Sequence, residues 1–283
     1  MKVHHLNCGT MHPILCGKTV CHVLLVETDN DLVLIDAGFG SKDCADPARR
    51  LGPARRILRP ALDHQEAAIN QVERLGFRRE DVRHIVITHF DPDHIGGISD
   101  FPEAQIHVTT AEADSMLRAP SLNERIRFRA VQWAHGPKVI EHTPDGEKWR
   151  GFAAAKELTE VSPGIALISL PGHTRGHACV AVDAGDRWVL HCGDAFFHHS
   201  TIDGTRMPRA IAAFETATAF DRKMVQQNHA RLNELYGRRE PDMFMVCSHD
   251  LTLYEQAKAP RESQCKSPRK PWSPHPSKPC GTN

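Results

Sequence analysis

The stretch from Ile85 to Gly97 constrains this chain more than any other part of it. It runs from strand-like apolar residues into a segment with four potential metal ligands in six consecutive positions, and two glycines follow. Imidazole and carboxylate groups of this kind suit zinc, iron or manganese. Such a density of ligands predicts a metal site at the end of a buried strand. The four residues are His89, Asp91, Asp93 and His94.

Three further apolar runs also end in residues that bind metals. The runs at 165–170, 188–192 and 243–247 are each followed within a few positions by a histidine or an aspartate. Because a buried strand is rigid, a side chain just beyond its end is held in place. We therefore expect these residues to converge with the first motif. They are His173, Asp194 and His249.

This ordered series resembles the metallo-β-lactamase superfamily, whose pattern is HxHxDH followed by a histidine, an aspartate and a histidine. The resemblance extends over residues 1–255 or so and implies an αββα sandwich, a layered α+β/α/β fold. One position departs from the pattern, because Asp91 stands where the family has its second histidine. The fold expectation therefore rests on the whole series and not on that position.

The resemblance also implies two metal sites that share a bridging carboxylate. His89, Asp91 and His173 would hold the first ion, Asp93, His94 and His249 the second, and Asp194 both. Asp93 and Asp194 are in addition the catalytic candidates. Two such ions can activate one bridging hydroxide for attack on a carbonyl carbon.

The departure at Asp91 affects the choice of metal. A carboxylate in place of an imidazole adds one negative charge and a harder donor, so iron or manganese become alternatives to the expected zinc. A second interpretation stays open, in which Asp91 misses the metal and only hydrogen-bonds a water molecule. Two further residues belong to the expected surroundings: Asp36, either a buried partner of the ligands or a turn-forming aspartate, and His177, a support for the loop.

Within the superfamily the chain resembles the acyl-homoserine lactonases, in the long segment after Asp36, the helix that ends near Gly76 and the residues from Asp93 to Gly97. Those lactonases carry a tyrosine three residues after the bridging aspartate, and Phe197 stands there in this chain. We expect a dinuclear hydrolase of an ester or lactone bond in a small molecule.

Three alternatives to that activity stay open. A thioesterase resembling hydroxyacylglutathione hydrolase would need a basic glutathione-binding cluster, and none is evident in the sequence. An iron-dependent oxidoreductase of the same fold is the second, because flavodiiron proteins use a carboxylate in the first motif, although the tail of this chain is too short for their flavodoxin domain. The third is a binding protein without metal, which fits poorly because every ligand position holds a metal-binding residue.

Composition limits the partners of the chain. Its 35 basic and 35 acidic residues give a formal net charge of zero, so a nucleic-acid partner is not expected. No apolar run approaches the roughly 20 residues of a membrane span. The start lacks the apolar core of a signal peptide, and the nine cysteines are scattered without a CxxC pair. We therefore expect a cytoplasmic protein with reduced thiols, and we leave its oligomeric state open.

Domain organisation follows from the same pass along the chain. Residues 1–257 would form the catalytic domain, in which 120–160 do not read as regular sheet and would cap the site. Residues 258–283 hold six basic residues against one acidic residue and several prolines, which predicts a disordered basic tail. One long helix is expected over 212–236, with Phe220 facing inward.

Overall fold

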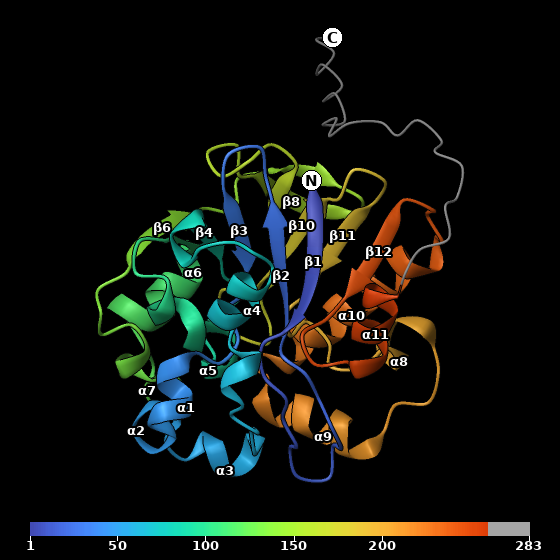
Figure 1. Cartoon of the computed structure of the whole chain (residues 1–283). Coiled ribbons are helices and arrows are strands. Elements are labelled where there is room, and N and C mark those ends of the chain that lie inside the picture. The colour runs from blue at the N-terminus through green and yellow to red at the C-terminus, as the bar shows by residue number, and fades with distance from the viewer. Residues whose placement is uncertain (260–283) are drawn as a thin grey trace.

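The structure is a computed structural model, and it describes residues 1–259. Two six-stranded sheets form the centre of the molecule, with helices on both outer sides (Figure 1). This is the αββα sandwich expected from the sequence. The predicted tail lies outside the described residues, apart from Lys258 at the end of the last helix and Ala259. Among residues 1–259, no helix is long and apolar enough to cross a membrane.

The first sheet contains the first six strands in chain order. Strands β1 to β3 pair antiparallel, and β3 to β6 continue the sheet in parallel. The connections between parallel strands must cross over the sheet, so they carry most of the helices of this half. The strands are β1 (Lys2–Asn7), β2 (His22–Glu27), β3 (Leu32–Ile35), β4 (Val82–Val86), β5 (Gln105–Thr109) and β6 (Lys138–His142).

The second sheet contains the last six strands, which likewise lie side by side in chain order from β7 to β12. Strands β7 to β11 pair antiparallel, whereas β12 lies parallel to β11 after a helical crossover. The strands are β7 (Glu147–Trp149), β8 (Phe152–Glu157), β9 (Ile165–Ser169), β10 (Ala178–Asp183), β11 (Trp188–His191) and β12 (Met243–Val246).

Helices occupy the connections and the end of the described chain. The longest are α9 and α10 in the crossover between β11 and β12. The helices are α1 (Ser41–Ala45), α2 (Pro47–Leu51), α3 (Ala54–Leu58), α4 (Ala68–Arg74), α5 (Pro92–Ile95), α6 (Thr110–Ala113), α7 (Leu122–Arg127), α8 (Ser200–Asp203), α9 (Arg209–Thr218), α10 (Arg222–Gly237) and α11 (Leu251–Lys258).

The core has two main layers because the inner strands β2 and β3 of the first sheet are buried on both faces. Successive side chains of a strand point to opposite faces. On β2, Leu24 and Val26 therefore pack against the second sheet, whereas Val23 and Leu25 belong to the cluster that includes residues of α4. Burial on both faces explains the continuous apolar runs that the sequence shows in these strands.

Two local expectations were wrong. Residues 138–157 do form sheet, as β6, β7 and β8, because pairing with neighbouring strands determines their conformation where the local sequence gives no clear strand pattern. The helix expected over 212–236 is two helices, since α10 begins anew where the Asp221 carboxylate accepts the backbone N–H groups of Lys223 and Met224. Phe220 lies in the break between them and is 53% exposed.

A buried ion pair ties the α1–α2 segment to the loop that follows the first motif. Arg50 donates from Nε to Asp43 Oδ1 over 2.7 Å and from Nη2 to the carbonyl of Gly96 over 3.0 Å. Gln132 Oε1 accepts from the same Nη2 atom over 2.5 Å. Asp43 is fully buried, so its charge depends on this arginine.

Replacing Arg50 by leucine should therefore destabilise the fold strongly. The change leaves the Asp43 carboxylate buried without its cation, which costs about 3–5 kcal/mol in comparable pairs. Chemical denaturation measures this difference, and Arg49→Leu on the same helix is the matched control because Arg49 is exposed. Equal stability of the two variants would contradict a dependence of Asp43 on Arg50.

Candidate metal centre

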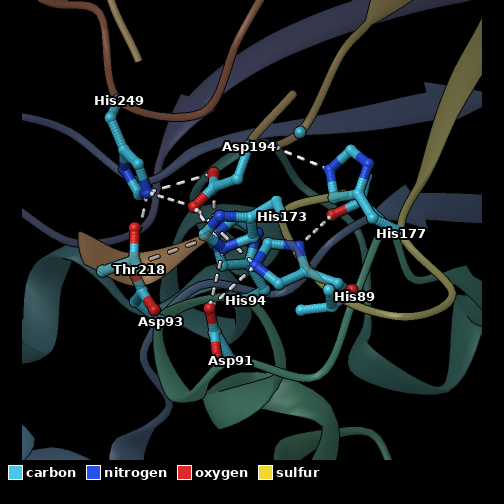
Figure 2. A network of polar contacts seen from close by, with 12 residues as sticks. His89, Asp91, Asp93, His94, His173, His177, Asp194, Thr218 and His249 are labelled. Carbon is cyan, nitrogen blue, oxygen red and sulfur yellow. Dashed lines mark hydrogen bonds and ion pairs between the residues drawn. The ribbon is translucent and has the colours of Figure 1, made fainter. Parts of the chain in front are cut away.

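All seven ligand candidates lie together at one end of the sandwich (Figure 2). His89, Asp91, Asp93 and His94 come from the loop after β4 and from α5, which begins at Pro92. His173 lies between β9 and β10, Asp194 follows β11, and His249 follows β12. The first sheet therefore supplies one part of the centre and the second sheet the other.

The first cluster consists of His89, Asp91, His173 and Asp194, all buried. Asp91 Oδ2 lies 3.2 Å from His89 Nε2 and 3.0 Å from His173 Nε2. Asp194 Oδ2 lies 3.7 Å from His89 Nε2 and 3.3 Å from His173 Nε2. These four donors suit a small divalent ion by their chemistry and their mutual closeness.

The second cluster surrounds the other oxygen of Asp194. Asp194 Oδ1 lies 3.3 Å from His94 Nε2 and 3.1 Å from His249 Nε2. Asp93 Oδ2 lies 3.5 Å from His249 Nε2 and 3.9 Å from His94 Nε2. The two oxygens of Asp194 thus face one cluster each, with His249 close to both of them.

In three of the four histidines, a contact of the other ring nitrogen fixes the direction of the ring. His94 Nδ1 donates to Asp36 Oδ2 over 2.8 Å, and His249 Nδ1 donates to the carbonyl of Val20 over 2.9 Å. His89 Nδ1 lies 3.0 Å from the Thr88 hydroxyl. All three rings therefore turn Nε2 inward, which is the arrangement that metal-binding histidines adopt.

Two buried atoms of the second cluster show that a metal ion fits there. Within the described residues, neither His94 Nε2 nor Asp194 Oδ1 has a hydrogen-bond partner. When His94 has no proton on Nε2, this nitrogen and Asp194 Oδ1, 3.3 Å apart, bring two lone pairs together in the interior, which is costly unless a proton or a metal ion takes those lone pairs. A divalent ion between His94, Asp93, His249 and Asp194 would do so.

The charges of the second cluster favour protons when no metal is bound. Burial lowers the pKa of His94, but the charges of Asp194, Asp36 and Asp93 outweigh it and hold the pKa well above its ordinary value. Burial likewise opposes protonation of His249, and Asp194 and Asp93 still raise its pKa to about 9. At neutral pH both imidazoles would therefore carry an extra proton in the metal-free chain.

Asp36 is both of the things that the sequence left open. Its backbone is left-handed, with φ of 60°, at the end of β3. Its carboxylate also accepts from the N–H and hydroxyl groups of Thr88, as well as from His94. The turn thus aims a buried carboxylate at the back of a ligand. His177 similarly contacts Asp194, whose backbone N–H donates to His177 Nε2 over 3.0 Å.

A cavity of about 550 Å³ opens over the ligands, and its wall is largely apolar. Phe197 lies at its floor, with its ring centroid 5.6 Å from that of His173 and 5.4 Å from that of His249. A phenyl ring offers no hydroxyl to a substrate at this position. The other apolar lining residues include Leu51, Ile57, Leu58, Ile126 and Phe214.

Comparison with known proteins agrees with this architecture. The family model described as the metallo-beta-lactamase superfamily matches residues 16–249. The chain belongs to this superfamily. A relative from Mycobacterium tuberculosis, named a probable metallo-hydrolase, is 58% identical over 259 residues, which are 91% of this chain and 83% of the relative. The N-acyl homoserine lactonase of Bacillus thuringiensis is 23% identical over 238 residues, 84% of this chain and 82% of that protein.

Solved structures that are similar to this chain show the same fold. A structure of an N-acyl homoserine lactone hydrolase, with the product N-hexanoyl-L-homoserine at its metal centre, has a TM-score of 0.62 at 22% identity. It covers 92% of this chain and 96% of its own. A probable metal-dependent hydrolase from Staphylococcus aureus has a TM-score of 0.64 at 17% identity, with 88% and 89% covered. With the ligand clusters, these findings support a metal-dependent hydrolase.

Sequence reasoning missed three residues of the centre. Glu112 is fully buried and accepts hydrogen bonds from the N–H groups of Phe90 and Gly176 and from the Thr174 hydroxyl. It therefore joins two loops that carry ligand candidates. Burial raises the pKa of its carboxyl group to about 7. Cys21 lies with Asp93 and His249 in a third group of possible ligands. Arg127 contacts Asp91 directly. All three are distant in sequence from the motifs, so no local pattern points to them.

Loading the second site at neutral pH should release about two protons per ion, because the ion displaces those that the raised pKa values of His94 and His249 keep bound. Calorimetric titration of the metal-free chain in buffers of different ionisation enthalpy measures this number. Release should decline as the pH rises through the pKa of His249, about 9. No release at pH 7 would contradict the protonated state inferred for the two imidazoles.

Replacing Asp36 by asparagine should weaken metal binding roughly 10–100-fold, as loss of a ligand's partner does in other metal sites. Asparagine tolerates the left-handed backbone, and its oxygen can keep the Thr88 contacts. Its NH₂ group would then face His94 Nδ1 and favour the tautomer with a proton on Nε2, where the metal needs a lone pair. Competition with a chelator measures the affinity, and Asp29→Asn at an exposed position is the control. Unchanged affinity would mean that Asp36 serves the turn alone.

Proposed function

We propose that the chain hydrolyses an ester or lactone bond in a small, partly apolar molecule, with two divalent ions, zinc being expected, in the centre. The observation that carries this proposal is the position of Asp194. Its carboxylate lies between two groups of buried imidazoles and carboxylates, with one oxygen toward each. A single residue in that position suits two ions that share a ligand.

Bound ions would supply Lewis acidity, lowering the pKa of a water molecule and polarising the carbonyl of the substrate. The chain's own residues prepare this chemistry. The contacts of His94 with Asp36 and of His249 with Val20 hold the ligand nitrogens inward before any ion arrives. The apolar wall, including Phe197, keeps bulk water from the ester while it reacts.

The cavity supports a substrate with an apolar part. From residues 120–160, for which a capping role is predicted, Ile126 and Arg127 line the cavity. The Bacillus thuringiensis lactonase named above is a distant relative over most of this chain's length. An N-acyl lactone is therefore the first substrate to test. Because Phe197 has no hydroxyl group, the carbonyl of such a substrate would lack the hydrogen bond that a hydroxyl-bearing residue could donate at this position.

The purified chain, loaded with zinc, manganese or iron, should hydrolyse members of a panel of lactones, esters and thioesters. Asp194→Ala should remove most bound metal and nearly all turnover, because this residue serves both clusters. Asp29→Ala at an exposed position is the matched control. Preference for thioesters would favour the thioesterase, and oxygen consumption by the iron form without hydrolysis would favour the oxidoreductase.

A further inference from the structure

The first cluster already contains a cation that belongs to the chain. Arg127, the last residue of α7, donates from Nε to Asp91 Oδ1 over 2.6 Å and from Nη2 to Asp91 Oδ2 over 2.5 Å. Its Nη1 donates to the carbonyl of Thr218 over 2.7 Å. The guanidinium thus binds both oxygens of the carboxylate that stands in place of the family's histidine.

The same guanidinium contacts the imidazole of His173. Arg127 Nη2 lies 2.6 Å from His173 Nε2. Because an arginine in a protein always carries its protons, Nε2 must be the acceptor in this contact. An imidazole nitrogen has one lone pair, directed in the plane of the ring. His173 therefore cannot accept from Arg127 and bind a metal ion through Nε2 at the same time.

The charges around the two clusters also make the first site the less favourable one for a metal ion. Arg127 neutralises Asp91, so a dication that enters the first site must displace or face a positive group. In the second cluster, the salt bridges of Asp93 within residues 1–259 involve only His94 and His249. An arginine keeps its positive charge in a protein, so the guanidinium can make room for an ion only by moving away from Asp91 and His173.

We propose that Arg127 and a metal ion compete for the first site, so that the two sites fill in sequence. The second site, where His94 Nε2 and Asp194 Oδ1 lack hydrogen-bond partners, binds its ion before the first site does. The first site takes an ion only after the guanidinium has left Asp91 and His173. This inference rests on the metal centre proposed above and not on the bond that the protein cleaves.

A different role for Arg127 predicts the opposite result. If the arginine only held Asp91 in position as a metal ligand, its removal would weaken binding at the first site. The ion at that site is the second ion to bind. If the arginine competes, its removal strengthens that binding. The sign of the change therefore separates the two roles, whatever its size.

Zinc titration of the metal-free chain in competition with a chromophoric chelator tests the proposal. The unchanged chain should bind one ion tightly and a second at least about tenfold more weakly. In Arg127→Met, which keeps the length of the side chain without its charge, the second ion should bind roughly tenfold more tightly or better. Affinity for the first ion should stay the same, which also reports that the variant is folded. Arg125→Met is the matched control, because Arg125 lies on the same helix and is exposed.

Unchanged or weaker binding of the second ion in Arg127→Met would overturn the proposal. Arg127→Lys provides a second measurement should the methionine variant misfold. An ammonium group lacks the planar fork that reaches both oxygens of Asp91 and His173 together. Second-ion affinity in Arg127→Lys should therefore exceed that of the unchanged chain, and an equal or lower value counts against competition. A chain that shows these isotherms and hydrolyses nothing would refute the proposed function alone.

Discussion

The buried carboxylate of Asp194 is the group around which the rest of this structure is arranged. A negative charge in the interior is stable only where positive or hydrogen-bonding groups surround it. Here four imidazoles do so: His89 and His173 lie near one oxygen, His94 lies near the other, and His249 lies close to both. Asp91 and Asp93 add further negative charge to the same space. The centre thus requires cations, whether protons, metal ions or a guanidinium.

The resemblance to the superfamily implied the αββα fold, and local signals in the sequence predicted the convergence of the ligand residues. His89, Asp91, Asp93 and His94 share one short loop, so their closeness needs no knowledge of the fold. His173 and His249 follow apolar runs that become buried strands ending on the same side of the sandwich. The contact of Asp36 with His94 was an even choice at the level of sequence, since a turn-forming aspartate looks the same.

The remaining features depend on tertiary contacts that no local pattern encodes. Arg127 is one of several basic residues between positions 120 and 160, and only the fold brings it to Asp91. Glu112 reads as an ordinary helical residue until its contacts with Phe90 and Gly176 are seen. Strands β6 to β8 show no clear strand pattern in the local sequence and are determined by pairing with their neighbours. The exposed Phe220 was placed inward because helical periodicity continued across a break that Asp221 creates.

The distribution of the ligands between the two sheets has a mechanical consequence. His94 and Asp93 are attached to the first sheet, and His249 and Asp194 to the second, while the apolar layer between the sheets has no direction of its own. An ion held by residues of both sheets would link the two sheets at one end of the sandwich and limit their sliding and twisting relative to one another. Under the proposed function, the same metal–ligand bonds would then support both the reaction and the rigidity of that end. A chain that loses its ions would lose alignment there first, well before the hydrophobic layer itself gives way.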